Sequence, residues 1–377
     1  MTEPSRATFW RDGDDPGRRL FVALLGPSGA GFALEGGGHL GEVTVAYETW
    51  GELNAAADNA VLVLHALSGD SHVAGPSGPS HPTQGWWDGL VGPGAAVDTE
   101  RYFVVCPNVL GGCQGTTGPS SLARDGRPYG SRFPTLTIRD QVDVEVGLAD
   151  ALGIEQFAAV VGGSMGGMRV LEWAVGHPSR LARAVVVSTG AAATADEIAL
   201  CSLQVRAIRL DPHFKGGDYY ASGAGPVGGM AIARGIGHFS YRSALEFQER
   251  FGREAQGDED PMRGGRYAIE SYLEYHGDKL GRRFDANSYI VLSEAMNRHD
   301  VGRGRGGLQA ALGTVEVPVT VAGVTSDRLY PLVAQEQLVE LLPRSGALEV
   351  VRSPFGHDGF LLEVGQVGAI VASALRR

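Results

Sequence analysis

Three residue types that together activate a hydroxyl nucleophile occur in this chain in a set order. Ser164 lies in "GGSMG" (162–166), which fits the pattern G-x-S-x-G, and Asp327 and His357 follow in "TSDRLYP" and "SPFGHDGF". A serine hydroxyl is a weak nucleophile at neutral pH until a histidine takes its proton, and a carboxylate must orient that histidine. The three residues therefore predict acyl transfer through a covalent intermediate on Ser164.

The segments on either side of Ser164 decide how much the motif means, because a chain with 56 glycines contains short glycine motifs by chance. An apolar run at 157–162 precedes the serine, and "GGMRVLEWAVGHP" after it has a helical pattern. A strand, a tight turn with small residues and a helix form the context that a nucleophilic serine of this kind needs. The turn also places Ser164 at a helix N-terminus, where backbone N–H groups stabilise an oxyanion.

Asp327 and His357 each follow a predicted strand, at 317–322 and 348–351. Their separation of 357 − 327 = 30 residues leaves room for one helix and one strand. An alternative interpretation is that Asp327 caps a helix starting near Pro331 and that His357 is an ordinary loop residue. We favour the triad because all three residues come at the carboxyl ends of strands, where ligands bind in open α/β sheets.

An oxyanion hole needs two backbone donors, and we predict Met165 and, from the loop "LHALSGDSH", Leu67. His65 and His72 in the same loop could suggest a metal, but no carboxylate or thiolate lies beside them at ligand spacing. We therefore expect hydrogen-bonding roles for both and no metal site. Cys113 has no strand-to-helix turn of its own, so we expect a buried or loop thiol rather than a nucleophile.

Short apolar runs alternate with helical patterns, which predicts an α/β fold with a mostly parallel central sheet. The segment 41–53 alternates polar and apolar residues, which indicates antiparallel edge strands. Apolar residues at helical spacing over 138–152 predict a helix lying on the sheet. The clearest strand candidates span residues 60–67, 102–107, 157–162, 184–188, 317–322 and 348–351.

Residues 193–313 lack strand-like runs of comparable strength, and helical stretches and polar loops dominate there. Sheet-like segments resume after this stretch. We therefore predict a core in two parts, 1–192 and 314–377, with an inserted helical cap at 193–313. No prediction is made for the first 35 residues.

The composition limits the partners of this 377-residue chain. Its net charge of −11 and pI near 5.4 argue against nucleic-acid and anionic-membrane partners, although a local basic funnel could still bind an anionic small molecule. Three cysteines cannot pair completely, and from the apolar pattern we expect neither a signal peptide nor a transmembrane helix. These features predict a cytoplasmic protein.

Several long and specific stretches cover both the core and the cap: "GWWDGLVGPG", "NVLGGCQGTTGPSS", "VVGGSMGGM", "GRYAIESYLEYHGDKL", "SYIVLSEAMNRHDVGRGRGG" and "GHDGFL". They resemble the corresponding stretches of the α/β-hydrolase-fold homoserine O-acetyltransferases of methionine biosynthesis. The resemblance implies a double displacement with acetyl-CoA as co-substrate and L-homoserine as acceptor. It also implies a homodimer with contacts through the cap, and no permanently bound cofactor.

The resemblance also implies residues that bind the acceptor. Arg234 and Asp358 would hold its α-carboxylate and α-ammonium groups, and Tyr241 would lie with them in the substrate site. Without the resemblance, Arg234 would be taken for a solvated residue of the cap.

Other functions remain open on the same scaffold. A serine esterase or thioesterase would use the same triad, and succinyl-CoA or L-serine could replace the donor or the acceptor. A binding module without catalysis is a further alternative, although such proteins usually lose a triad member.

Overall fold

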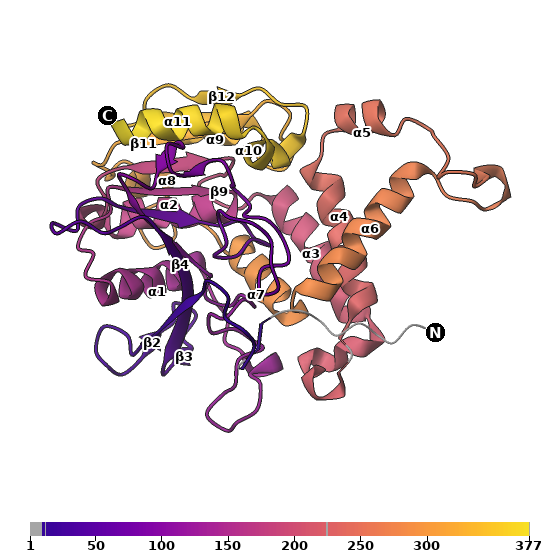
Figure 1. Cartoon of the computed structure of the whole chain (residues 1–377), viewed down its shortest axis with the longest axis horizontal. Coiled ribbons are helices and arrows are strands. Elements are labelled where there is room, and N and C mark those ends of the chain that lie inside the picture. Colours follow the sequence, from indigo (N-terminus) through magenta and orange to yellow (C-terminus); the bar gives the residue numbers. More distant parts are fainter. Residues whose placement is uncertain (1–9, 12, 224, 377) are drawn as a thin grey trace.

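The computed structural model of the chain describes residues 10–11, 13–223 and 225–376. An eight-stranded sheet runs through its centre in the order β1-β4-β8-β5-β9-β10-β11-β12, with helices on both faces (Figure 1). Strands β8 to β12 of this order are parallel, and β4 is antiparallel to both of its neighbours. The predicted α/β class with a mostly parallel sheet is confirmed. The strands of this sheet are β1 (Leu20–Leu24), β4 (Val43–Trp50), β5 (Ala60–Leu64), β8 (Phe103–Pro107), β9 (Ala159–Gly163), β10 (Ala184–Val187), β11 (Val319–Val324) and β12 (Glu349–Val351).

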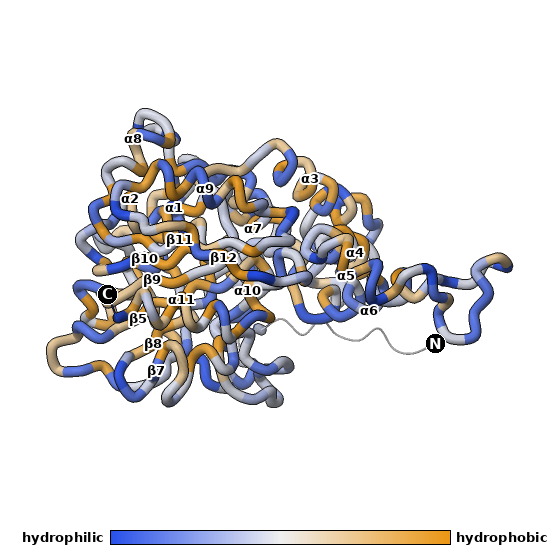
Figure 2. Tube along the Cα trace, turned by 90° about the horizontal axis from the view of Figure 1, so that it is seen from above, coloured by the Kyte–Doolittle hydropathy of each residue, from blue (hydrophilic) through white to orange (hydrophobic). Residues whose placement is uncertain are grey.

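Alternate residues of the central strands pack into two separate cores. In β5, Leu62 and Leu64 belong to the core under α1 (Ile138–Ala151) and α2 (Met165–Gly176), whereas Val61 and Val63 belong to the core under α11 (Val364–Arg376). Because both faces are covered, these strands consist of continuous apolar residues without polar alternation. Figure 2 shows this apolar centre, with hydrophilic segments mostly at the periphery.

The prediction that the segment 41–53 forms the edge of the sheet is wrong. The segment 41–53 forms a single antiparallel strand, β4, but β1 pairs along its free side from Leu20↔Tyr47 to Leu24↔Val43. Strand β4 is therefore an inner strand, which explains why Val45 and Ala46 are both buried. The edge strand β1 lies within the first 35 residues, for which the sequence pattern gave no prediction.

The chain leaves the sheet between the adjacent parallel strands β10 and β11 and forms helices there. Helices α3 (Ala195–Leu210), α4 (Val227–Tyr241), α5 (Ala244–Arg250) and α6 (Ala268–Arg283) project to one side of the sheet in Figure 1, and α4 packs against both α3 and α6. Helices α7 (Ala286–Asn297) and α8 (Leu308–Leu312) lead back to β11. All of these helices lie within the segment 193–313 that the sequence predicts as a cap.

The two ends of this helical excursion are paired with each other. The backbone N–H of Val301 donates to the carbonyl of Ala191 (3.0 Å), and that of Ala193 donates to the carbonyl of His299 (2.9 Å). The ring of His299 also contacts the carbonyl of Gly190 at 3.2 Å. The root of the cap is therefore a short two-stranded contact just beyond the end of β10.

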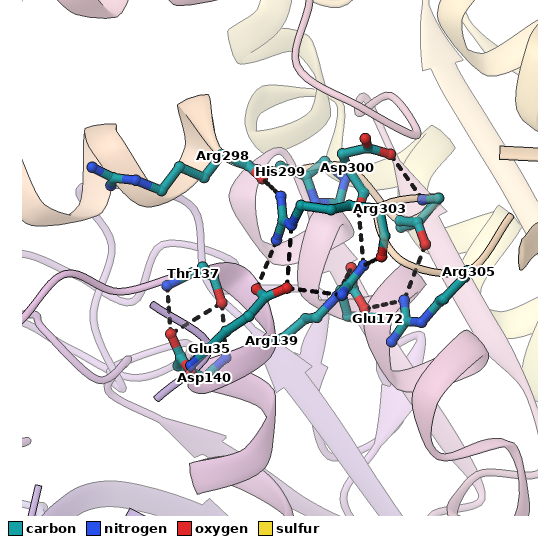
Figure 3. A network of polar contacts seen from close by, with 12 residues as sticks. Glu35, Thr137, Arg139, Asp140, Glu172, Arg298, His299, Asp300, Arg303 and Arg305 are labelled. Carbon is teal, nitrogen blue, oxygen red and sulfur yellow. Dashed lines mark hydrogen bonds and ion pairs between the residues drawn. The ribbon is translucent and has the colours of Figure 1, made fainter. Parts of the chain in front are cut away.

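Ion pairs tie this root to helix α2, which begins next to Ser164 (Figure 3). The buried carboxylate of Glu172 on α2 pairs with Arg305 (2.6 Å) and Arg139 (3.3 Å). Glu35 pairs with Arg139 (2.9 Å) and with Arg303 (2.7 Å). The segment "RHDVGRGR" thus fixes the returning chain against the two helices that cover one face of the sheet.

Among the described helices, none by itself is long and apolar enough to cross a membrane. Among these described helices, only Gly356–Leu362 and Val364–Arg376 taken together have the length and composition of a membrane span, and the two are bent by 66° relative to each other.

Candidate active site

The backbone at Ser164 has a conformation that residues other than glycine rarely adopt. Ser164 lies between β9 and α2 with φ 57° and ψ −126°, and its side chain is buried. A positive φ at a residue other than glycine costs energy unless the surrounding structure imposes it. Here the Ser164 N–H donates to the carbonyl of Val187 on β10 at 3.0 Å. The turn therefore has the sharp geometry that the G-x-S-x-G motif predicts.

The glycines around Ser164 are required by close backbone approaches. A Cβ atom at Gly162 would lie 2.6 Å from the backbone of Gly166, and one at Gly166 would overlap the carbonyl oxygen of Leu64 on β5. Neither obstacle is a flexible side chain, so neither can move aside cheaply. The tight packing of β9, β5 and the start of α2 thus explains the glycines.

Asp327 and His357 are brought together as the sequence predicts. The Nδ1 atom of His357 lies 2.7 Å from Oδ2 of Asp327, and both side chains are buried. The other oxygen of Asp327 accepts hydrogen bonds from the N–H groups of Leu329 and Tyr330, each at 2.9 Å. Asp327 therefore orients the histidine with one oxygen and holds its own loop, just before α9 (Leu332–Leu341), with the other.

The charge of Asp327 also acts on the protonation of His357. Burial by itself lowers the pKa of His357, but the negative charge and the hydrogen bond of Asp327 outweigh it, so the pKa is raised above the ordinary histidine value. An environment that stabilises the imidazolium form is what a general base needs when it takes a proton from a serine.

Both predicted oxyanion donors lie close to Ser164 in the chain or in the cavity wall. Leu67 and Met165 are buried, and in the part of the chain that the structure describes neither backbone N–H makes a hydrogen bond. Leu67 and Ser164 line the same cavity, and Met165 is the first residue of α2. Unpaired buried N–H groups beside a nucleophile are suited to bind a developing oxyanion.

His65 has the hydrogen-bonding role that the sequence suggests. Its Nδ1 atom lies 2.8 Å from the carbonyl of Ala66, and its Nε2 atom accepts from the N–H of Val109 at 3.1 Å. Burial lowers the pKa of His65 to about 3, so the ring is neutral. The buried Arg169 of α2 donates to the carbonyl of His65 and pairs with Glu145 at 2.6 Å. These contacts fix the loop that carries Leu67.

The surroundings of His72 differ from the expectation, because a carboxylate lies beside its ring. Its Nδ1 atom is 3.0 Å from the buried carboxylate of Glu48, and its ring stacks on that of His81 with centroids 4.1 Å apart. Glu48 comes 24 residues earlier on β4, so spacing along the loop could not reveal it. The three groups could be taken for a metal site. Their polar contacts are within the protein: the Nδ1 atom of His72 faces Glu48, and the Nε2 atom of His81 accepts a hydrogen bond from the N–H of Arg18 at 3.2 Å.

Cys113 is a buried thiol, as predicted. Its sulfur accepts a hydrogen bond from the N–H of Asp285 at 3.4 Å, and burial raises its pKa. It is not among the residues that line the cavity at Ser164.

The residues implied by the family resemblance lie in the same cavity as Ser164 and His357. Arg234 of α4 extends over the ring of Tyr241 at 5.4 Å, and its Nη1 atom donates to the hydroxyl of Ser68 at 3.3 Å. Asp358 follows His357 and pairs with Arg242 at 3.2 Å. Burial raises the pKa of Asp358, although the positive charges of Arg242 and Arg234 oppose this shift. Helix α4 thus brings a guanidinium into the cavity that also holds the carboxyl group of Asp358 and the hydroxyl of Ser164.

Three residues of this site were missed in the sequence. Ser68 contacts Arg234, Arg242 holds Asp358, and Glu197 of α3 lines the cavity. Ser68 follows Leu67 directly, so the prediction of Leu67 as an oxyanion donor could have pointed to Ser68 as well. For Arg242 and Glu197 the helical pattern gave no signal, because it does not show which side of a cap helix faces the core.

Together the parallel sheet, the sharp turn at Ser164 and the Asp327–His357 pair define the α/β hydrolase class. A family model described as "alpha/beta hydrolase fold" matches residues 59–364. The esterase E22 has a similar structure, with a TM-score of 0.85 and 27% identity over 95% of this chain and 99% of that one. The homoserine O-acetyltransferase from Bacillus anthracis gives a TM-score of 0.86 and 28% identity over 95% and 97%.

A curated relative is much more similar in sequence. The homoserine O-acetyltransferase of Thermobifida fusca is 57% identical over 376 residues, which is 99% of this chain and 98% of the relative. The chain therefore belongs to the homoserine O-acetyltransferase family, a group of acyltransferases within the α/β hydrolases.

Replacing the orienting carboxylate tests the triad. In Asp327→Asn we expect kcat to fall by about four orders of magnitude, because the amide favours the wrong imidazole tautomer. In the wild type the neutral base is lost as the pH falls through a raised pKa, so the acid limb of kcat/KM lies above about 6.5, the usual histidine value. In the variant this limb moves to lower pH, because the negative charge is gone.

The matched control is Asp143→Asn, which removes the carboxylate of an exposed Asp–His pair with His177 at 3.5 Å. Its pH–rate profile should be that of the wild type. Near-normal activity in Asp327→Asn would mean that another group orients His357.

Proposed function

We propose that the protein transfers the acetyl group of acetyl-CoA to the side-chain hydroxyl of L-homoserine, giving O-acetyl-L-homoserine for methionine biosynthesis. The observation that carries this proposal is the position of Arg234 and Asp358 in the same cavity as Ser164 and His357. A zwitterionic amino acid needs an anion and a cation partner near the nucleophile, and this cavity offers both. The name shared by the close relatives supports the same substrates.

In the first half-reaction, His357 takes the proton of Ser164 while the serine oxygen attacks the thioester carbon of acetyl-CoA. The oxyanion of the tetrahedral intermediate accepts hydrogen bonds from the N–H groups of Leu67 and Met165. The intermediate collapses by breaking the carbon–sulfur bond, and the imidazolium returns its proton to the leaving thiolate. The result is an acetyl ester on Ser164 and free coenzyme A.

In the second half-reaction, His357 takes the proton of the homoserine hydroxyl, whose oxygen attacks the ester carbon. The same two N–H groups hold the second oxyanion, and the proton passes to the oxygen of Ser164 as it leaves. Arg234 binds the α-carboxylate of homoserine, and Asp358 binds its α-ammonium group. These two contacts bring the hydroxyl to the acyl group at a high effective concentration.

A serine esterase is the second candidate, because the esterase E22 has the same fold at 27% identity. Hydrolysis needs only water at the acyl-enzyme, so a pair of opposite charges above the nucleophile would have no purpose. We favour transfer for this reason.

A steady-state screen of acetyl-CoA and succinyl-CoA against L-homoserine, L-serine and water tests the proposal. We expect the highest kcat/KM for acetyl-CoA with L-homoserine, and coenzyme A release matched by O-acetylhomoserine. Coenzyme A release that is independent of any amino acid would instead indicate a thioesterase.

Arg234 provides a sharper test of the acceptor site. In Arg234→Ala, discharge of the acyl-enzyme by homoserine should lose about 2 to 4 kcal/mol of transition-state stabilisation, the range for truncating one member of a buried charge pair. Acylation of Ser164 should stay near normal. Single-turnover kinetics that follow each half-reaction separately distinguish the two steps.

The control is Arg253→Ala, which removes an exposed cap arginine that lies over the ring of Tyr267. It should leave both half-reactions unchanged. If Arg234→Ala slows acylation and leaves the homoserine dependence intact, Arg234 serves the coenzyme A donor instead.

We also propose that the protein is a homodimer through its cap. Large apolar side chains on α3, α4, α5 and α6 are more than half exposed, which is unusual for the surface of a monomer. Light scattering at micromolar concentration should give the mass of two chains, and a monodisperse monomer would contradict the proposal. The side chains are Leu203, Leu210, Ile232, Phe239, Leu245 and Tyr275.

A further inference from the structure

A second carboxyl group, besides Asp358, lines the cavity that holds Ser164. Glu197 belongs to the first turn of α3, and its side chain is buried at 5% exposure. The Oε2 atom of Glu197 accepts a hydrogen bond from the N–H of Thr194 at 2.9 Å. The hydroxyl of Thr194 accepts in return from the N–H of Glu197. This reciprocal cap fixes the carboxylate on the cavity wall, and the triad mechanism gives it no task.

The charges divide the cavity into two sides. On the α4 side, the positive charges of Arg242 and Arg234 act on Asp358. On the α3 side, the charges that act on Glu197 most strongly are those of Asp196 and His357, and Leu200 and Cys201 are its neighbours in the wall. The α4 side therefore suits a zwitterionic acceptor, and the α3 side suits the acyl group of the donor.

Given the proposed function, we propose that Glu197 selects the acyl donor, because its carboxylate in the wall of the Ser164 cavity tolerates an uncharged acyl chain and repels one that ends in a carboxylate. An acetyl group brings no charge to the α3 side. A succinyl group would bring a second carboxylate into a buried space where Glu197 already holds one. Like charges in a poorly solvated site repel strongly, and an unpaired charge facing the wrong ligand is a common source of specificity.

The test compares succinyl-CoA with succinamoyl-CoA, in which an amide of nearly the same shape replaces the terminal carboxylate. Acylation of Ser164 is followed as coenzyme A release in single turnovers at about pH 8, where Glu197 with its pKa of about 7 is ionised. With the wild type we expect succinamoyl-CoA to react at least about tenfold faster than succinyl-CoA.

In Glu197→Gln the ratio of the rates with these two donors should fall about tenfold, through a relative gain of succinyl-CoA. The ratio is the readout because the charge of Glu197 also acts on His357, and that effect applies to both donors alike. Glutamine keeps an oxygen that can accept the Thr194 hydrogen bond, so the helix cap is preserved. The matched control is Asp196→Asn, which removes the same charge from the neighbouring exposed residue and should leave the ratio of the two donors as in the wild type.

Equal rates for the two donors with the wild type would overturn the proposal without any variant. An unchanged ratio in Glu197→Gln, or an equal change in Asp196→Asn, would overturn it as well. If no acyl-CoA acylates the wild type, the proposed function fails, and this result is distinguishable from the others.

Discussion

The backbone of Ser164, held at φ 57°, is the constraint on which the rest of the site depends. A residue other than glycine in a sparsely populated region costs about 1 to 3 kcal/mol and persists only where its surroundings over-determine it. Here β10 holds its N–H, the backbones at Gly162 and Gly166 pack too closely for side chains, and the buried Arg169–Glu145 pair anchors α2 behind it. The sheet must supply this rigidity before any chemistry is possible.

The parallel sheet also explains why residues distant in sequence meet at Ser164. Strands β9, β11 and β12 end at the same edge, so the loops after them deliver the serine, Asp327 and His357 to one place. The cap completes the site from above, and its root is fixed by the ion pairs of Glu172 with Arg139 and Arg305. These ion pairs hold the returning end of the helical segment against α2, so the side chains that its helices add to the cavity have a fixed position relative to Ser164.

The strands, the class of fold and the positions of Ser164, Asp327 and His357 at the ends of strands could be predicted because each leaves a local pattern: a continuous apolar run, a glycine turn, or a strand followed by a polar residue. Contacts between distant elements left no such pattern. The pairing of Glu48 with His72 joins a strand to a loop, and the direction of Glu197 depends on how α3 lies on the core. Arg234 was indicated by family resemblance alone, since its helix pattern suits a solvated residue equally well.

The central claim is a covalent acetyl group on Ser164 that homoserine removes faster than water does. The direct measurement is intact mass and peptide mapping after mixing the wild-type protein with acetyl-CoA and no acceptor, followed by addition of L-homoserine. The account predicts one acetyl group per chain on the peptide containing Ser164, discharged rapidly as O-acetylhomoserine. Transfer to homoserine with no acetylated Ser164 detectable at any time would contradict it.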